Sequence, residues 1–354
     1  MISISNHLAT IHENVPQFLN EVVEKMWLDL NPVDRFGQPM RRALTARANA
    51  LSGIIKGEEY IGKVGVEASA RHLKYAEYLE VPQNLKSIIT AKPAELKDII
   101  GTSRIYLEDG DICLEVGEKV EMQPFGQLLL KLFNYESYRA SKHCHERYEA
   151  LRFTEATCPY CNENSVRILK TNKLPKQDVV MLYDIDHFYP KHMFPFLALS
   201  FYNHIPSCKT CNQTYKGSKP FDIDTHIHPY HLCFDSIYTF EFNHSILSND
   251  PISKVKLKNK TDFPDQLVSV LQLESRYEGS TRLARTPRLI DILSKRSHLL
   301  RESALNASEH EMLIQALADF GLVQKKEDIL SNLHSKLHRD IVKMFDVRNT
   351  LNLS

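Results

Sequence analysis

Cys-Pro-Tyr-Cys at residues 158–161 and Cys-Lys-Thr-Cys at residues 208–211 are the two stretches that decide how this chain folds. Two intervening residues let each pair form a tight knuckle, and two knuckles supply the sulfurs of a closed tetrahedral zinc site. The four sulfurs belong to Cys158, Cys161, Cys208 and Cys211. A redox Cys-x-x-Cys motif and a chance grouping are the alternatives, and the occurrence of two pairs in one region argues against both. We therefore expect a structural Zn²⁺ with no open position for chemistry.

The segment between the two knuckles contains a second group of polar residues. An apolar, β-branched run at residues 179–183 predicts a strand, and it ends in Asp-Ile-Asp-His at residues 184–187. Asn203 follows, and the second knuckle continues into Asn212 and Lys216. Carboxylates, amides and an imidazole in this order are the side chains from which a metal-assisted hydrolytic site is built.

This pattern resembles the HNH nuclease superfamily. The matching parts are Asp-x-Asp-His at 184–187, Asn203, and Cys-x-x-Cys-Asn-x-x-x-Lys-Gly at 208–217. The family's ββα-metal core carries an Asp-His or His-His pair, a middle Asn and a final His or Asn. The resemblance covers residues 158–221. Within this range the sequence is similar to HNH domains with zinc knuckles and to the HNH domain of the RNA-guided CRISPR nucleases. Asp in place of the first His and Asn in place of the last both occur among these families and keep an oxygen ligand.

The resemblance implies a role for each of these residues. His187, whose ordinary pKa is about 6.5, would act as the general base that takes a proton from the attacking water, and Asn203 would hold that base in place. Asp186 and Asn212 would bind one catalytic Mg²⁺ or Mn²⁺, with Asp184 as a further ligand or as a residue that orients one.

Three lysines are candidates for contact with nucleic acid. Lys216 falls on the short helix expected after the second knuckle, where its ammonium would reach a phosphate oxygen. Lys219 and Lys209 are weaker candidates of the same kind.

Each residue also has an ordinary structural explanation. His187 taken alone is more often a structural histidine, the two aspartates are solvated residues at a strand end, and the asparagines are turn or cap residues. Their order and their position between two knuckles favour an intact site. The alternative is a catalytically inactive, zinc-stabilised module that binds nucleic acid or protein.

The flanks of the motif suggest a biological setting. The Cys-Pro-Tyr-Cys-Asn start at 158–162 and the Asp-His-Phe-Tyr-Pro-Lys run at 186–191 look like the HNH subunits of bacterial anti-phage systems such as Septu, which work beside an ATPase. The resemblance implies an endonuclease that cuts DNA as a defence effector, with an ATPase subunit as its partner. RNA stays open as a substrate.

The composition of the chain is that of an ordinary globular protein. Its 354 residues are 43% hydrophobic and 25% charged, and 44 basic residues balance 44 acidic ones. Any surface for a polyanion must therefore come from local clustering of basic side chains. We see neither a signal peptide nor a membrane-length apolar run, and paired cysteines favour a reducing compartment, so we expect a cytoplasmic protein without membrane contact.

Periodicity predicts an α+β fold in which a small zinc-stabilised ββα-metal core is flanked by helices. Residues 1–150 read as mainly helical, with a helix near 41–56 and a short hairpin near 104–116 around Asp-Gly. Residues 151–235 form the predicted nuclease core, and residues 236–354 read as short strands followed by helices. The histidines near its end, His226, His228 and His231, match no metal-ligand spacing and suggest a solvated or phosphate-proximal loop. An ordinary solvated face is the favoured explanation for Arg41, Arg42 and Arg47.

Overall fold

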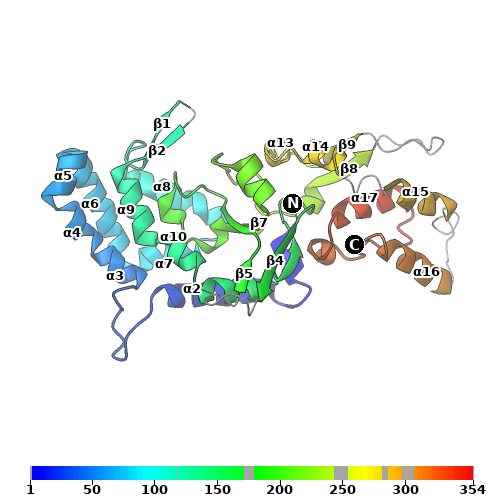
Figure 1. Ribbon diagram of the computed structural model, residues 1–354, viewed down its shortest axis with the longest axis horizontal. Helices are drawn as coiled ribbons and strands as arrows, with labels where there is room; N and C mark the ends of the chain where they lie inside the picture. The colour runs from blue at the N-terminus through cyan, green and yellow to red at the C-terminus, as the bar shows by residue number, and fades with distance from the viewer. Residues whose placement is uncertain are drawn as a thin grey trace.

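The computed structural model describes residues 2–117, 119–170, 179–242, 254–280, 286–296, 300 and 307–353. Figure 1 shows an elongated molecule with the N-terminal helices at one end, the C-terminal helices at the other and short strands between them. The α+β class is confirmed at this coarser level, as helices combined with small sheets. None of the described helices has both the length and the apolar character needed to cross a bilayer.

Helices build the first part of the chain. They are α1 (Ile4–Leu8), α2 (Val15–Leu30), α3 (Leu44–Asn49), α4 (Leu51–Ile55), α5 (Glu58–Val64), α6 (Val66–Glu80), α7 (Pro82–Thr90), η1 (Pro93–Glu95), α8 (Leu96–Tyr106), α9 (Pro124–Phe133), α10 (Tyr135–Arg139) and α11 (Lys142–Ala150). Helix α2 begins with an N-cap, since the side chain of Asn14 accepts a hydrogen bond from Gln17 N and Pro16 lies in the first turn. The helix predicted near 41–56 is divided in two at Ala50.

The hairpin predicted near 104–116 is wrong in its position. Residues 104–106 end helix α8, with Ile105 on its exposed face, and the hairpin pairs β1 (Cys113–Val116) with β2 (Lys119–Met122). Asp111 explains the difference, because its carboxylate accepts hydrogen bonds from Glu108 N and from Arg71. The ion pair with Arg71 holds the segment that contains Gly110 and Asp111 directly after helix α8. Local turn propensity alone does not predict a contact between residues so far apart in the sequence.

Short antiparallel hairpins occupy the middle of the molecule. Strands β3 (Glu155–Thr157), β4 (Ser165–Lys170) and β5 (Val179–Met181) form one sheet, and β6 (Asp184–His187) pairs with β7 (His204–Ser207) in another. The run predicted as one strand is thus divided at Leu182 and Tyr183. Leu182 N still donates to Arg167 O, whereas Tyr183 O accepts from Arg139, so the chain leaves the first sheet between these two residues.

The short elements η2 (Pro195–Leu197), η3 (Phe201–Asn203) and η4 (Thr210–Lys216) surround this hairpin. The last of them is a π-helix that begins within the second knuckle. The order β6, β7, η4 places a hairpin before a short helix.

The last part of the chain carries strands and then helices, as predicted. The elements are α12 (Phe234–Ile237), β8 (Tyr238–Phe242), β9 (Val255–Asn259), α13 (Leu267–Val270), α14 (Leu273–Glu278), α15 (Thr286–Lys295), α16 (Ala307–Ala318), η6 (Lys326–Ser331) and α17 (Ser335–Phe345). Gly321, with φ +84°, follows α16 and its N–H donates to Ala318 O, as is typical of a glycine that ends a helix.

Candidate metal centre and active site

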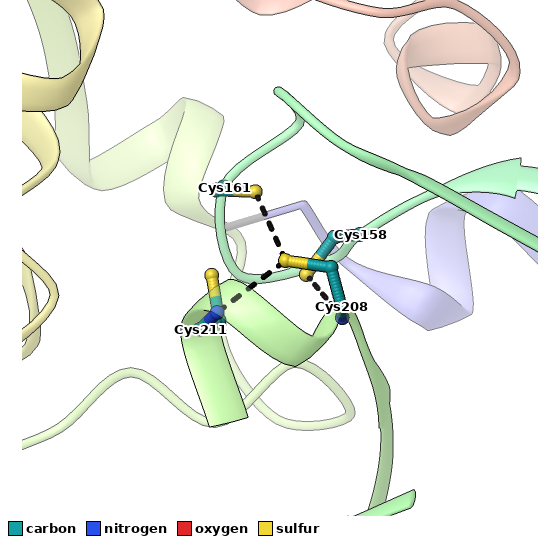
Figure 2. A group of neighbouring side chains, drawn as sticks. All are labelled: Cys158, Cys161, Cys208 and Cys211. Atoms are coloured by element: carbon teal, nitrogen blue, oxygen red, sulfur yellow. Dashed lines mark hydrogen bonds between the residues drawn. The ribbon is translucent and has the colours of Figure 1, made fainter. Parts of the chain in front are cut away.

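The four knuckle cysteines converge on one point. Their sulfurs all lie within 4.8 Å of one another and all four residues are buried, which confirms the predicted four-cysteine group. Figure 2 shows the two pairs facing each other, with Cys208 between the other three. A buried set of four thiols that can share one ion is a ligand set suited to zinc.

Backbone and side-chain donors surround these sulfurs. Cys208 N points to the sulfur of Cys158 and Cys211 N to that of Cys208, each at 3.4 Å. Arg276 on α14 donates from Nη1 to the Cys211 sulfur at 3.3 Å and forms an ion pair with Glu163. Such N–H···S contacts stabilise thiolate charge and orient metal ligands. The centre therefore ties residues 158–163 and 208–211 to a helix much further along the chain.

Asn162, directly after the first knuckle, anchors the C-terminal segment. Its backbone adopts a left-handed conformation with φ +52°, and its buried side chain bonds to both main-chain and side-chain groups. Its amide nitrogen donates to Thr157 Oγ1 and to the carbonyls of Ile329 and Asn332, and its oxygen accepts from Ser335 Oγ and Lys336 N. One side chain thus fixes the start of α17 against the metal centre. The sequence placed Asn162 in a motif but gave no sign of this contact.

Asn162→Ala is expected to destabilise the fold by about 3 kcal/mol, because several buried polar groups lose their partner at once. Denaturant unfolding measures this loss. The alanine variant loses the hydrogen bonds of the amide and also places alanine at a positive φ. Asn162→Gly separates these two causes, because glycine accepts the positive φ but also lacks the amide. We expect both variants to be destabilised, and a stable Asn162→Gly chain would show that backbone strain in the alanine variant is the cause.

Of the residues predicted for catalysis and for the divalent cation, all but Asn203 line a second feature, a cavity of about 460 Å³ beside β6 and η4. Its lining consists of Tyr135, Glu136, Arg139, Asp184, Ile185, Asp186, His187, Pro190, Lys191, His192, Asn212, Gln213, Lys216 and Gly217. The structure therefore brings together Asp184, Asp186, His187, Asn212 and Lys216, which the sequence pattern also grouped. Strand β6 and the helix that follows the second knuckle present them from two sides.

His187 is buried and held by its ring. Its Nε2 lies 3.1 Å from Ala198 O, and because a carbonyl only accepts, Nε2 carries the proton. Nδ1 is then the nitrogen that can take up a proton. Burial, with a smaller contribution from His204, lowers the pKa of His187 well below its ordinary value, so the ring is neutral at pH 7.

Asn203 lies behind the cavity and does not line it. Its Oδ1 accepts from Tyr189 N at 2.7 Å and its Nδ2 donates to the carbonyls of Tyr189 and Leu197. These bonds fasten the turn that follows His187, which is consistent with an indirect role for Asn203. A fully buried asparagine with every bond satisfied can hold the histidine in place through the backbone.

Asp186 is already paired with a cation of the protein itself. Lys216 Nζ lies 2.7 Å from both carboxylate oxygens and also donates to His187 O, and the Tyr160 hydroxyl donates to Asp186 Oδ2 at 2.7 Å. Lys216 is only 1% exposed. The ammonium predicted to face a phosphate thus lies inside the protein on the predicted metal ligand.

We tested whether the cavity residues fit a divalent cation. Asp184 Oδ2 accepts from Asn212 Nδ2 and from Gln213 Nε2, whereas the other oxygen of Asp184 and the amide oxygen of Asn212 accept no hydrogen bond from the described residues. Both oxygens of Asp186 are engaged by Lys216, however, so the set as arranged does not fit a divalent cation at Asp186. Among the described residues, the four cysteines are the only group of three or more Cys, His, Asp or Glu side chains placed to share an ion.

The remaining candidates are dispersed. Lys209, which precedes η4, and Lys219, which lies three residues after its end, are exposed, and Lys219 donates to Tyr215 O. Of the histidine cluster, His226 and His228 are buried, with His228 bonded to Tyr202 O, and only His231 is exposed. This part of the chain is therefore packed into the fold, in contrast to the solvated loop that we expected.

No protein-family model, no curated protein and no solved structure matches this chain. Function therefore rests on the chemistry of the cavity and of the metal centre.

Proposed function

We propose that this protein is an HNH-type endonuclease that hydrolyses phosphodiester bonds in DNA. The observation that carries the proposal is the cavity in which Asp184, Asp186, His187 and Asn212 meet on a hairpin followed by a short helix, next to a four-cysteine centre. The same residues give the sequence its resemblance to that superfamily. A role as an anti-phage effector with an ATPase partner has the sequence resemblance as its only support.

His187 is suited to be the general base. Its ring is held by Ala198 O on one side, and a neutral imidazole can accept the proton of a water at Nδ1 as that water attacks phosphorus. Asn203 keeps the following turn in place, so the ring does not depend on the substrate for its position. Arg139 at the cavity wall supplies positive charge that suits a phosphodiester, whereas Lys191 at the same wall is paired with Glu136.

The resemblance implies a divalent cation, Mg²⁺ or Mn²⁺, and we keep it in the proposal on one condition. Because the Lys216 ammonium is paired with the Asp186 carboxylate, that ammonium must move away before a cation can bind there. The structural Zn²⁺ is a separate matter, since its four ligands are buried and already assembled.

His187→Ala is expected to lower DNA cleavage at least a hundredfold, the scale of a lost general base. Nicking and linearisation of a supercoiled plasmid measure this effect, with magnesium and with a chelator. His192→Ala is the matched control, because that ring lines the same cavity and its loss should change the rate little. Equal cutting by wild type and His187→Ala would contradict the assignment.

The inactive binding module remains the second candidate, favoured by the ion pair that occupies Asp186. If this candidate is right, wild type and His187→Ala both bind DNA and neither cleaves it, with or without magnesium.

A further inference from the structure

A second cavity, of about 390 Å³, lies on the other side of helix α10 from the His187 cavity. Tyr135, Glu136 and Arg139 of this helix line the catalytic cavity, whereas Ser137 and Tyr138 line the second one. The opposite wall of the second cavity carries Arg42, which precedes α3, and Arg47, which lies on it. We call this second space the arginine cavity.

Arg47 lacks a partner for its charge. The side chain is half-buried, its Nε is buried without a hydrogen bond, and none of the described residues forms an ion pair with it. A guanidinium held in a partly apolar cavity without an acceptor is costly for the fold, and such groups are normally paired. An anion from outside the chain would satisfy it.

The carboxylate that lines the arginine cavity does not neutralise Arg47. Asp29 is the sole acidic residue in its lining, and its carboxylate is engaged by Arg147 at 2.8 Å and lies 3.4 Å from His143 Nδ1. Arg42 is exposed at the rim. Two arginines thus face one cavity in which the only negative charge is already used.

The surrounding segment strengthens the positive charge. Residues 32–49 contain four arginines and a single acidic residue, Asp34, in a chain whose net charge is zero. The Asp34 carboxylate accepts from Phe36 N and Gln38 N, within its own turn. Positive charge therefore gathers here, and the rest of the chain must carry the compensating acidic surface.

We propose that the arginine cavity binds a backbone phosphate of the nucleic acid that is cut at His187. This inference rests on the proposed nuclease function and adds a contact outside the motif region. A helix with its side chains is about 10–12 Å across, and a strand of duplex DNA advances about 3.4 Å per phosphate along its axis. A phosphate roughly three nucleotides from the one in the catalytic cavity would therefore reach Arg42 and Arg47. Arg47 offers a planar fork of donors, the geometry that pairs with phosphate.

Binding of a fluorescein-labelled DNA duplex to the His187→Ala chain tests the proposal, because no cleavage step enters the measurement. Adding Arg47→Ala is expected to weaken binding on the order of tenfold, and to reduce the slope of log K against log salt by about one. Arg41→Ala removes the same charge from a neighbouring position outside the arginine cavity and should change affinity much less. Arg47→Lys should recover only part of the loss, because it keeps the charge and lacks the fork.

Stability separates a binding role from a structural one. Because the Nε of Arg47 is buried without an acceptor, Arg47→Ala should melt at the same temperature as the parent or higher. A lower melting temperature would show that the guanidinium supports the fold and would overturn the proposal. Unchanged DNA affinity and an unchanged salt slope would also overturn the proposal. If Arg47→Ala instead loses a protein partner while DNA binding stays intact, the arginine cavity binds a carboxylate of that partner and the proposal is overturned.

This inference and the nuclease proposal fail in different ways. Absence of cleavage by the wild type contradicts the nuclease, whereas the arginine cavity is judged by affinity and salt slope alone.

Discussion

Cys208→Ser is expected to remove bound zinc and to prevent the chain from folding stably. Structural zinc sites bind with an apparent free energy of about 10–16 kcal/mol at neutral pH, as much as or more than the stability of a typical domain. Cys208 is also the cysteine whose neighbours include all three others in Figure 2. Its loss therefore opens the centre and separates the two knuckles.

Metal analysis by mass spectrometry and thermal unfolding measure this outcome. The wild type should carry one zinc ion per chain, and Cys208→Ser should carry none and show no cooperative transition. Cys144→Ser is the matched control, because Cys144 is equally buried and lies outside the four-cysteine group. A full zinc content in Cys208→Ser would refute the four-sulfur site.

Lys216→Met is the second large expected effect. It removes the ammonium from Asp186 and leaves a buried carboxylate with the Tyr160 hydroxyl as its remaining described partner. Breaking a buried ion pair from one side costs about 3–5 kcal/mol. We therefore expect the midpoint of urea unfolding to fall markedly, with zinc content unchanged.

The double variant Lys216→Met with Asp186→Asn identifies the cause. It removes both charges and keeps a polar group for Tyr160, so most of the lost stability should return. A single variant as stable as the wild type would mean that the ion pair does not persist in solution. Calorimetric titration of the single variant Lys216→Met with Mn²⁺ adds an independent readout. Any ion that binds at Asp186 should bind this variant more tightly than the wild type, because the ammonium is gone.

The sequence predicted the four-cysteine group well because the information for it is local. Cysteine spacing of two residues specifies a knuckle whatever the surrounding fold, and both knuckles formed as expected. The order of Asp184, Asp186, His187 and Asn212 likewise specified a shared cavity, since they lie on a hairpin and on the helix that follows it. The strands and helices after residue 236 followed from ordinary periodicity.

Contacts between distant residues were not predictable in this way. The pairing of Lys216 with Asp186, the ion pair of Arg71 with Asp111 and the anchoring of α17 by Asn162 each depend on which side chains are buried together. The Asp-Gly turn signal failed for that reason. The sequence favoured an ordinary solvated face for Arg47, and the structure differs from this in the buried, unsatisfied Nε of a half-buried side chain.

The contact between Arg276 and Cys211 has a consequence for the order in which the protein is made. A nascent chain that has emerged as far as residue 242 already contains all four cysteines and every lining residue of the His187 cavity. It still lacks Arg276 and the segment that Asn162 binds. A ribosome-bound or prematurely terminated product of this length would therefore hold the groups proposed for cleavage without the parts that fasten them, so the proposed activity should appear only once residue 336 has emerged.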